Sequence, residues 1–182
     1  NISMILQDSI NSLNPYEKIK KQLLETYIFH SKKKITNDFA IEEIKKLLLD
    51  VGFEDTDRIL NSYPNELSGG MRQRAALLRT YLFSNETALL DEPFSALDAI
   101  TKHRMHLWYL DIMKQIKMST LFITHDIDEA IILSDRIYIL SGSPGKITAE
   151  IEVDIDRCGD NEELQLSEKF LRYKKEILEY LK

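Results

Sequence analysis

Apolar residues recur every three or four positions through most of residues 16–83, and this spacing is typical of amphipathic helices. One helix is predicted soon after Tyr16, and a second ends at Gly52, because glycine commonly terminates helices. A short helix is expected at 56–62, and Ser68 has the position of a cap for the next one. The apolar positions are Ile19, Leu23, Leu24, Tyr27 and Ile28; Ile41, Ile44, Leu47, Leu48 and Val51; and Ala75, Leu78 and Leu82.

Short apolar runs outside that segment predict β-strands, with residues 2–6, 87–90 and 121–123 expected to be buried. The runs are residues 2–6, 87–90, 121–123, 137–140 and 146–153. Two helices fall between them, one capped by Asp98 and one at 127–133. The first carries an apolar stripe formed by Met105, Tyr109, Ile112 and Ile116. Strands that alternate with helices indicate an α/β fold with a parallel sheet and crossover connections.

The chain of 182 residues fits a single domain that is helix-rich overall. We expect residues 1–15 and 84–155 to form the α/β core, with residues 16–83 inserted as a helical subdomain. Residues 156–182 are expected to form a helical tail, because Asp160 and Glu163 have capping-box spacing. The expected apolar stripe of this tail is Leu164, Leu171, Leu178 and Leu181.

The composition narrows the function classes. A net charge of −6 argues against a nucleic-acid-binding surface, which normally carries a basic excess. The one cysteine, Cys158, cannot form an internal disulfide. No apolar run approaches the roughly 18 residues that a membrane-spanning helix needs, so a role in a membrane process would depend on partners.

Two adjacent carboxylates, Asp91 and Glu92, follow the apolar run 87–90 directly, and Pro93 ends the run. At the end of a strand one carboxylate can hold Mg²⁺ and a second can orient or deprotonate an attacking water. The pattern alone is weak, because a solvated acidic turn after a structural strand has the same sequence.

A hydroxyl and two glycines, Ser68, Gly69 and Gly70, precede a predicted helix. Free backbone N–H groups and the helix dipole favour an anion at such a position. Taken alone, three residues of this kind are more often a glycine-rich turn with a serine cap.

The surrounding residues carry a resemblance to a known family. Leu67-Ser-Gly-Gly-Met-Arg-Gln-Arg74 resembles the signature motif of the ATP-binding cassette (ABC) ATPases. Other segments resemble, in the family's order, its Q-loop, Walker B segment, D-loop and switch-histidine loop. These are Leu6-Gln-Asp8, Leu89-Leu-Asp-Glu-Pro93, Ser95-Ala-Leu-Asp98 and Ile123-Thr-His-Asp126. The resemblance covers about residues 1–150 and implies a partial P-loop NTPase-type parallel sheet with an inserted helical subdomain.

The resemblance implies ATP and Mg²⁺ as cofactors and gives roles to four residues of the chain's own site. Asp91 and Gln7 would support Mg²⁺, and Glu92 would act as the general base for water. His125 would contact the γ-phosphate, and Gln7 would also link the site to a membrane partner. His30, His103 and His106 have no such context and are interpreted as structural.

The resemblance also implies partners. Ser68, Gly69, Gly70 and Gln73 would bind a nucleotide held by a second ATPase subunit, and Asp98 would lie at that homodimer interface. The ATPase would power solute import through transmembrane permease subunits, with a solute-binding protein acting indirectly. It would therefore be peripheral, at the cytoplasmic face of the membrane.

A P-loop, Gly-x₄-Gly-Lys-Ser/Thr, is absent from these residues. The only glycine followed by lysine is Gly145, and Ile147 comes next. In the family the P-loop precedes the Q-loop, so we expect that the chain starts inside a larger domain and that it binds ATP weakly or not at all alone. We also expect that the remaining sheet has an unpaired edge.

The motifs leave the solute open. Residues 91–101 and 124–130 resemble the importers of nitrate, sulfonate, taurine and thiamine precursors, whereas residues 7–15 resemble the peptide and nickel group. Two other functions compete with the importer. One is a non-catalytic remnant or regulatory binding module, and the other is a soluble cassette ATPase of translation or repair.

Overall fold

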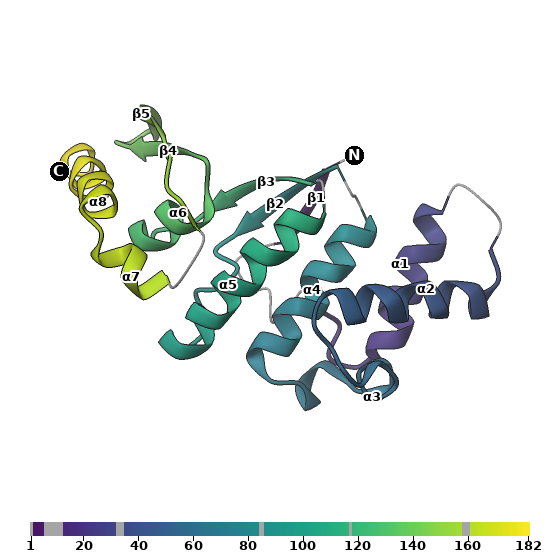
Figure 1. Ribbon diagram of the computed structural model, residues 1–182. Coiled ribbons are helices and arrows are strands. Elements are labelled where there is room, and N and C mark those ends of the chain that lie inside the picture. The colour runs from purple at the N-terminus through teal and green to yellow at the C-terminus, as the bar shows by residue number, and fades with distance from the viewer. Residues whose placement is uncertain (1, 6–12, 32–34, 84–85, 117, 158–160) are drawn as a thin grey trace. The chain divides into compact units, whose positions relative to one another are not determined.

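The computed structural model describes residues 2–5, 13–31, 35–83, 86–116, 118–157 and 161–182 (Figure 1). It consists of two compact units, residues 1–123 and 124–182. Gln7, Cys158 and Asp160, which the sequence singled out, lie outside the described residues. Among the helices that are described, none combines the length and the apolar character that crossing a bilayer requires.

The first unit contains a parallel sheet of three strands: β1 (Ile2–Ile5), β2 (Thr87–Asp91) and β3 (Ser119–Ile123). The described residues place β2 at the centre, where Leu89 pairs with Met4 on one side and with Leu121 on the other. The predicted α/β class and parallel pairing are therefore confirmed. The helix α5 (Ala99–Gln115) connects β2 to β3.

The predicted burial of β3 was wrong. Leu121 and Ile123 are 56 % and 45 % exposed, whereas Ala88 and Leu90 of β2 are fully buried. The difference follows from position, because β3 pairs only with β2 among the described strands and is an edge of the sheet. A run of apolar residues identifies a strand but does not show whether it is central.

The segment 16–83 is helical, as predicted. It forms α1 (Ile19–His30), α2 (Asn37–Asp50), α3 (Thr56–Asn61), a 3₁₀ turn (Pro64–Glu66) and α4 (Gly69–Phe83). Two predicted ends are confirmed: Gly52 follows α2 with φ of 82°, and the Ser68 hydroxyl accepts a 3.3 Å hydrogen bond from the N–H of Met71. The boundaries between α/β core, helical subdomain and tail remain a proposal.

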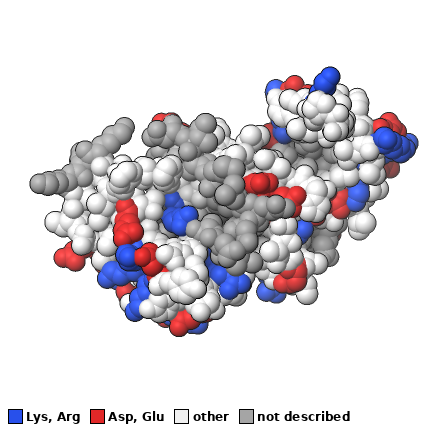
Figure 2. Space-filling model, turned by 180° about the vertical axis from the view of Figure 1, so that it is seen from behind, with Lys and Arg blue, Asp and Glu red and all other residues white. Residues whose placement is uncertain are grey.

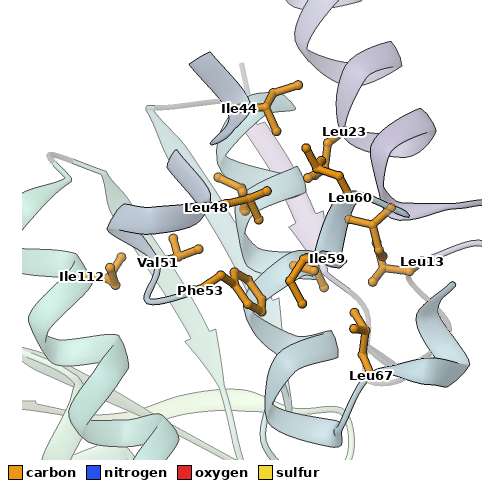
Figure 3. Close-up of a cluster of buried hydrophobic side chains, with 14 residues drawn as sticks. Leu13, Leu23, Ile44, Leu48, Val51, Phe53, Ile59, Leu60, Leu67 and Ile112 are labelled. Atoms are coloured by element: carbon orange, nitrogen blue, oxygen red, sulfur yellow. The ribbon is translucent and has the colours of Figure 1, made fainter. Parts of the chain in front are cut away.

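These helices share one apolar core (Figure 3). Of the residues that the helical periodicity identified, Ile19, Leu23, Ile44, Leu48, Val51, Ala75 and Leu78 are buried in it, Leu24, Tyr27, Ile41, Leu47 and Leu82 are partly buried against it, and Ile28 is exposed. α1, α2, α3 and α4 each contribute, and Ile112 brings in α5. The buried members are Leu13, Ile19, Leu23, Ile44, Leu48, Val51, Phe53, Ile59, Leu60, Leu67, Ala75, Ala76, Leu78 and Ile112. This core fixes α4, the helix that starts at the signature residues.

The second unit contains α6 (Ile127–Leu133), an antiparallel pair of strands, β4 (Arg136–Ser141) and β5 (Lys146–Glu152), and the helices α7 (Asn161–Leu166) and α8 (Glu168–Tyr180). The predicted strand at 137–140 therefore belongs to a separate two-stranded sheet. In this unit the side chain of Lys174 forms an ion pair of 2.6 Å with Asp128, which ties α8 to α6.

The predicted stripe of the tail helix was also wrong. Leu171, Leu178 and Leu181 are about half exposed, and the residues that α8 buries are Phe170, Tyr173 and Ile177. The tail breaks at Ser167, whose side chain caps α8, so a stripe drawn from Leu164 across the break has no common face.

Candidate nucleotide site

The two adjacent carboxylates lie where the central strand ends. Asp91 is the last residue of β2 and is half-buried. Glu92 follows with a left-handed φ of 47°, the only positive φ among the described non-glycine residues. Its N–H donates a 2.8 Å hydrogen bond to the carbonyl oxygen of Ile123 on β3. Left-handed conformations of non-glycine residues are strained and concentrate at functional sites.

Phe94 anchors the turn that follows Glu92. Its side chain is fully buried, and its ring centroid lies 5.4 Å from that of His106 and 5.8 Å from that of Phe122. The carbonyl of Glu92 accepts a 2.9 Å hydrogen bond from the hydroxyl of Ser95. Phe94 was not predicted from the sequence, although a large aromatic residue in a turn was a signal. His106, which was predicted to be structural, is buried beside Phe94.

The signature glycines lie against the D-loop segment and the helix that follows it. A Cβ atom at Gly69 would approach Leu97 to 3.1 Å, and one at Gly70 would approach the sulfur of Met105 to 3.4 Å. Residues 69–70 and 97–105 are thus in close contact although they are far apart in sequence. The small side chains allow this approach and leave the first N–H groups of α4 near the surface.

A hollow of about 440 Å³ lies at this contact. Its lining brings the predicted residues Ser68, Gly69, Gly70 and Asp98 together with two arginines, Arg74 and Arg104. The remaining lining residues are Met71, Ala96, Leu97, Thr101 and Met105. A hydroxyl, backbone N–H groups at a helix start and an arginine, Arg104, suit an anionic group, whereas the guanidinium of Arg74 is directed to Gly52 and Trp108.

Asp98 caps α5 as predicted, accepting a 3.0 Å hydrogen bond from the N–H of Thr101. Hydrogen bonds from the side chain and the backbone of Thr101 hold the pKa of the Asp98 carboxyl below its ordinary value. The carboxylate is therefore charged at neutral pH. Gln73, by contrast, is 2 % exposed and does not line the hollow.

His125 belongs to the second unit, where it is exposed just before α6. Its neighbours are held in place: the hydroxyl of Thr124 accepts a 3.0 Å hydrogen bond from the N–H of Asp126. The Asp126 side chain in turn accepts from the N–H of Glu129 at 3.2 Å. The local turn therefore presents the imidazole to solvent.

Asp91 is the candidate Mg²⁺ ligand among the described residues. Across the described part of the chain, no three His, Cys, Asp or Glu side chains converge as a metal site. Mg²⁺ does not need such a cluster, because it is commonly held by one or two carboxylates with waters and substrate phosphates completing the octahedron. The half-buried carboxylate of Asp91 at the strand end fits that role.

Comparison with known proteins decides the family. A family model described as ABC transporter matches residues 1–95, just over half of the chain. The chain belongs to the ABC transporter family. The matched segment includes the signature residues 68–70 and the carboxylates at 91 and 92.

Curated relatives lie in the same family. The chain is 40 % identical over 150 residues to an uncharacterized ABC transporter ATP-binding protein of Methanocaldococcus jannaschii, covering 82 % of this chain and 54 % of the relative. It is 41 % identical over 128 residues to a nitrate import ATP-binding protein of Synechocystis sp., with coverage of 66 % and 47 %. An aliphatic sulfonates import ATP-binding protein of Bacillus cereus is 43 % identical over 148 residues, with coverage of 81 % and 55 %. The chain thus spans about half the length of these relatives.

A solved structure confirms the fold. An ATP-binding cassette in a dimeric, post-hydrolysis state bound to ADP and Pi superposes with a TM-score of 0.66 at 24 % identity. The match covers 86 % of this chain and 64 % of that one. The P-loop NTPase-type α/β fold predicted from the sequence is that of the ABC ATPases.

Proposed function

We propose that this chain is the catalytic and dimer-forming part of an ATP-hydrolysing subunit that powers solute import. One observation carries the proposal: a single unit presents Asp91 and Glu92 at the end of its central strand and Ser68, Gly69 and Gly70 at a separate anion-suited hollow. Relatives named as import ATP-binding proteins support the importer role.

In this proposal Asp91 holds Mg²⁺, together with Gln7. The metal, when bound with ATP, neutralises charge on the phosphates. Glu92 orients the attacking water and accepts its proton, and the hydrogen bond from its N–H to Ile123 fixes the backbone from which this carboxylate extends. His125 is proposed to contact the γ-phosphate.

The hollow is proposed to serve a second copy of the subunit. Ser68, Gly69 and Gly70 bind the γ-phosphate of a nucleotide held by the other copy, and Gln73 supports them from the same helix. Asp98 lies at the interface between the copies. The dimeric state of the solved cassette with the same fold supports this arrangement.

Permease subunits are the proposed membrane partners, with a solute-binding protein acting indirectly, so the ATPase would lie at the cytoplasmic face of the membrane. The names of the relatives favour the nitrate and sulfonate group over the peptide and nickel group. On the surface shown in Figure 2, Lys and Arg lie among Asp and Glu rather than in one basic area.

The proposal is tested by measuring ATP hydrolysis of the 182 residues alone and of the intact subunit with its permease. P-loop amides and a lysine supply much of the phosphate binding in such enzymes. We expect background hydrolysis from the 182 residues and stimulated hydrolysis from the intact complex. Full activity of the 182 residues alone would contradict the expectation that hydrolysis requires a P-loop. An intact complex without ATP hydrolysis would instead favour the regulatory module.

A further inference from the structure

Helices α4 and α5 lie side by side (Figure 1) and meet in two successive layers. In the first layer Gly70 faces Thr101 and Met105, at 3.5 and 3.4 Å from the position of a Cβ. In the second layer, one turn further along both helices, the guanidinium of Arg74 lies 5.5 Å from the ring centroid of Trp108. Both Gly70 and Arg74 of α4 therefore contact α5, and Arg74 does so one turn later.

Both residues of the second layer also hold the end of α2. The Nη1 atom of Arg74 donates a 3.2 Å hydrogen bond to the carbonyl oxygen of Gly52. The indole Nε1 of Trp108 donates a 2.9 Å hydrogen bond to the carbonyl oxygen of Val51. Carbonyl groups at a helix end lack partners within the helix, so these two donors satisfy them.

Gly52 makes this approach feasible. Its φ of 82° turns the chain, and a Cβ atom there would lie 3.1 Å from Nη1 of Arg74. Three helices, α2, α4 and α5, thus meet at one group of residues: Val51, Gly52, Arg74 and Trp108. We call this group the Arg74–Trp108 cluster.

We infer that Arg74 and Trp108 are positioning residues for the turn Ser68–Gly70, fixing the start of α4 against α5 so that its N–H groups face the phosphate. This inference rests on the proposed function, in which that turn binds the nucleotide of a second copy. Arg74 lies one turn after Gly70 on the same helix, so its contacts with Gly52 and Trp108 hold α4 one turn away from Ser68–Gly70. Misplacement of a substrate-positioning group by about 1 Å can cost up to about 10²-fold in rate.

Residues outside this cluster also anchor α4. Ala75, Ala76 and Leu78 of the same helix are almost fully buried in the core, whereas Arg74 is only half-buried. A lysine at 74 keeps the charge and most of the length. It lacks the planar fork that lets arginine lie against the indole while donating to Gly52. Arg74→Lys should therefore change the position of the turn and leave the core packed.

The first experiment measures steady-state ATP hydrolysis by the intact subunit. For Arg74→Lys and Trp108→Phe we expect kcat to fall about tenfold with the KM for ATP unchanged, and the melting temperature to fall slightly, because each change weakens a hydrogen bond to the end of α2. Arg79→Lys is the matched control, since Arg79 lies on the same helix and outside the cluster, and it should retain the wild-type rate. An unchanged kcat in Arg74→Lys, or a raised KM, would overturn the inference.

The second experiment asks in which composite site Arg74 acts. Subunits carrying Arg74→Lys are mixed with subunits carrying Glu92→Gln, and the mixed dimer is purified through two different tags. In the proposed function each site pairs Glu92 of one copy with the turn Ser68–Gly70 of the other copy. If Arg74 acts through the turn of its own copy, one site of the mixed dimer therefore has both an intact Glu92 and an intact turn. The mixed dimer should then hydrolyse ATP as fast as a dimer of wild-type and Glu92→Gln subunits. A rate as low as that of the Arg74→Lys homodimer would overturn the inference.

The Glu92→Gln homodimer separates this inference from the proposed function. If that homodimer hydrolyses ATP at the wild-type rate, the proposed function fails. If the homodimer is inactive while Arg74→Lys retains the wild-type rate, the proposed function stands and the positioning role is wrong.

Discussion

The N–H of Glu92 and the carbonyl oxygen of Ile123 are joined by a 2.8 Å hydrogen bond at the last paired position of β2 and β3, where Asp91 pairs with Ile123. The residue that donates this bond has a φ of 47°. The backbone of the proposed general base is therefore held by the sheet, although its conformation is one that non-glycine residues rarely adopt.

Glu92→Gln should lower the rate of ATP hydrolysis by the intact subunit roughly 10²–10⁴-fold, the usual contribution of a general base. Glutamine has nearly the same size and cannot accept the proton, so ATP binding and the melting temperature should stay unchanged. The measurement is steady-state phosphate release. Glu54→Gln, an exposed carboxylate near the end of α2, is the control and should keep full activity. Full activity of Glu92→Gln would exclude this carboxylate as the base.

Replacing Glu92 with glycine and with alanine should separate backbone strain from side-chain chemistry. A left-handed conformation costs roughly 1–2 kcal/mol for a residue with a Cβ, and glycine avoids this cost. The loss of chain flexibility on folding offsets part of the gain for glycine. We therefore expect Glu92→Gly to be about 0.5–1 kcal/mol more stable than Glu92→Ala in urea unfolding. Equal or lower stability of the glycine variant would show that this position is not strained.

Leu48 and Leu49 provide a matched pair on α2. Leu48 is fully buried in the shared core, whereas Leu49 is 55 % exposed. Leu48→Ala should lower the free energy of unfolding by about 2–5 kcal/mol, because it removes transfer free energy and leaves a cavity. Leu49→Ala should change it by about 0.5 kcal/mol. Chemical unfolding followed by circular dichroism measures both, and equal effects would contradict the helix orientation.

Gly52→Ala should destabilise the chain by roughly 1–2 kcal/mol, the cost of a Cβ in the left-handed region. Displacement of the Arg74 guanidinium, 3.1 Å from the new methyl group, adds to that cost. Gly145 is the control, because no atom lies within 4 Å of a Cβ placed there. Thermal unfolding of both alanine variants tests the difference, and an unchanged Gly52→Ala variant would be inconsistent with this turn.

Asp98 predicts a pH dependence of stability. Its pKa is lowered in the folded chain by the hydrogen bonds from Thr101, so the carboxylate stabilises the fold above the unfolded-state pKa of about 3.9. That contribution is lost as pH falls through the lower, folded-state pKa. The stability difference between wild type and Asp98→Ala should therefore be full at pH 7 and shrink below about pH 4. A difference that is constant with pH would mean that the charge has no part in the cap.

Local chemistry in the sequence predicted much of the fold. The caps at Ser68 and Asp98 and the turn at Gly52 were found because each needs only the residue itself and a few neighbours. The buried stripe of α2 was found because it depends only on periodicity. The predictions failed where burial depends on distant partners, as for Leu121 on an edge strand and Leu171 on the outer side of α8.

In the candidate site, too, local motifs were predicted from the sequence and long-range contacts were not. Motif order identified Asp91, Glu92 and Ser68 from the sequence, because adjacent residues define those motifs. Contacts over long sequence separations were not accessible, such as that of Trp108 with Val51 or of Phe94 with Phe122. These contacts depend on how α5 packs against other elements, and no short pattern of residues encodes that packing.

The exposed face of β3 has a practical consequence for work with these 182 residues. Leu121 and Ile123 are exposed on the same face of an edge strand, whereas the strands of parallel sheets are normally covered on both faces. Such an edge can recruit other polypeptide chains as protein concentration rises. We therefore expect this short strand to limit the solubility of the purified polypeptide, and charged substitutions at these two positions are the first remedy to try against precipitation.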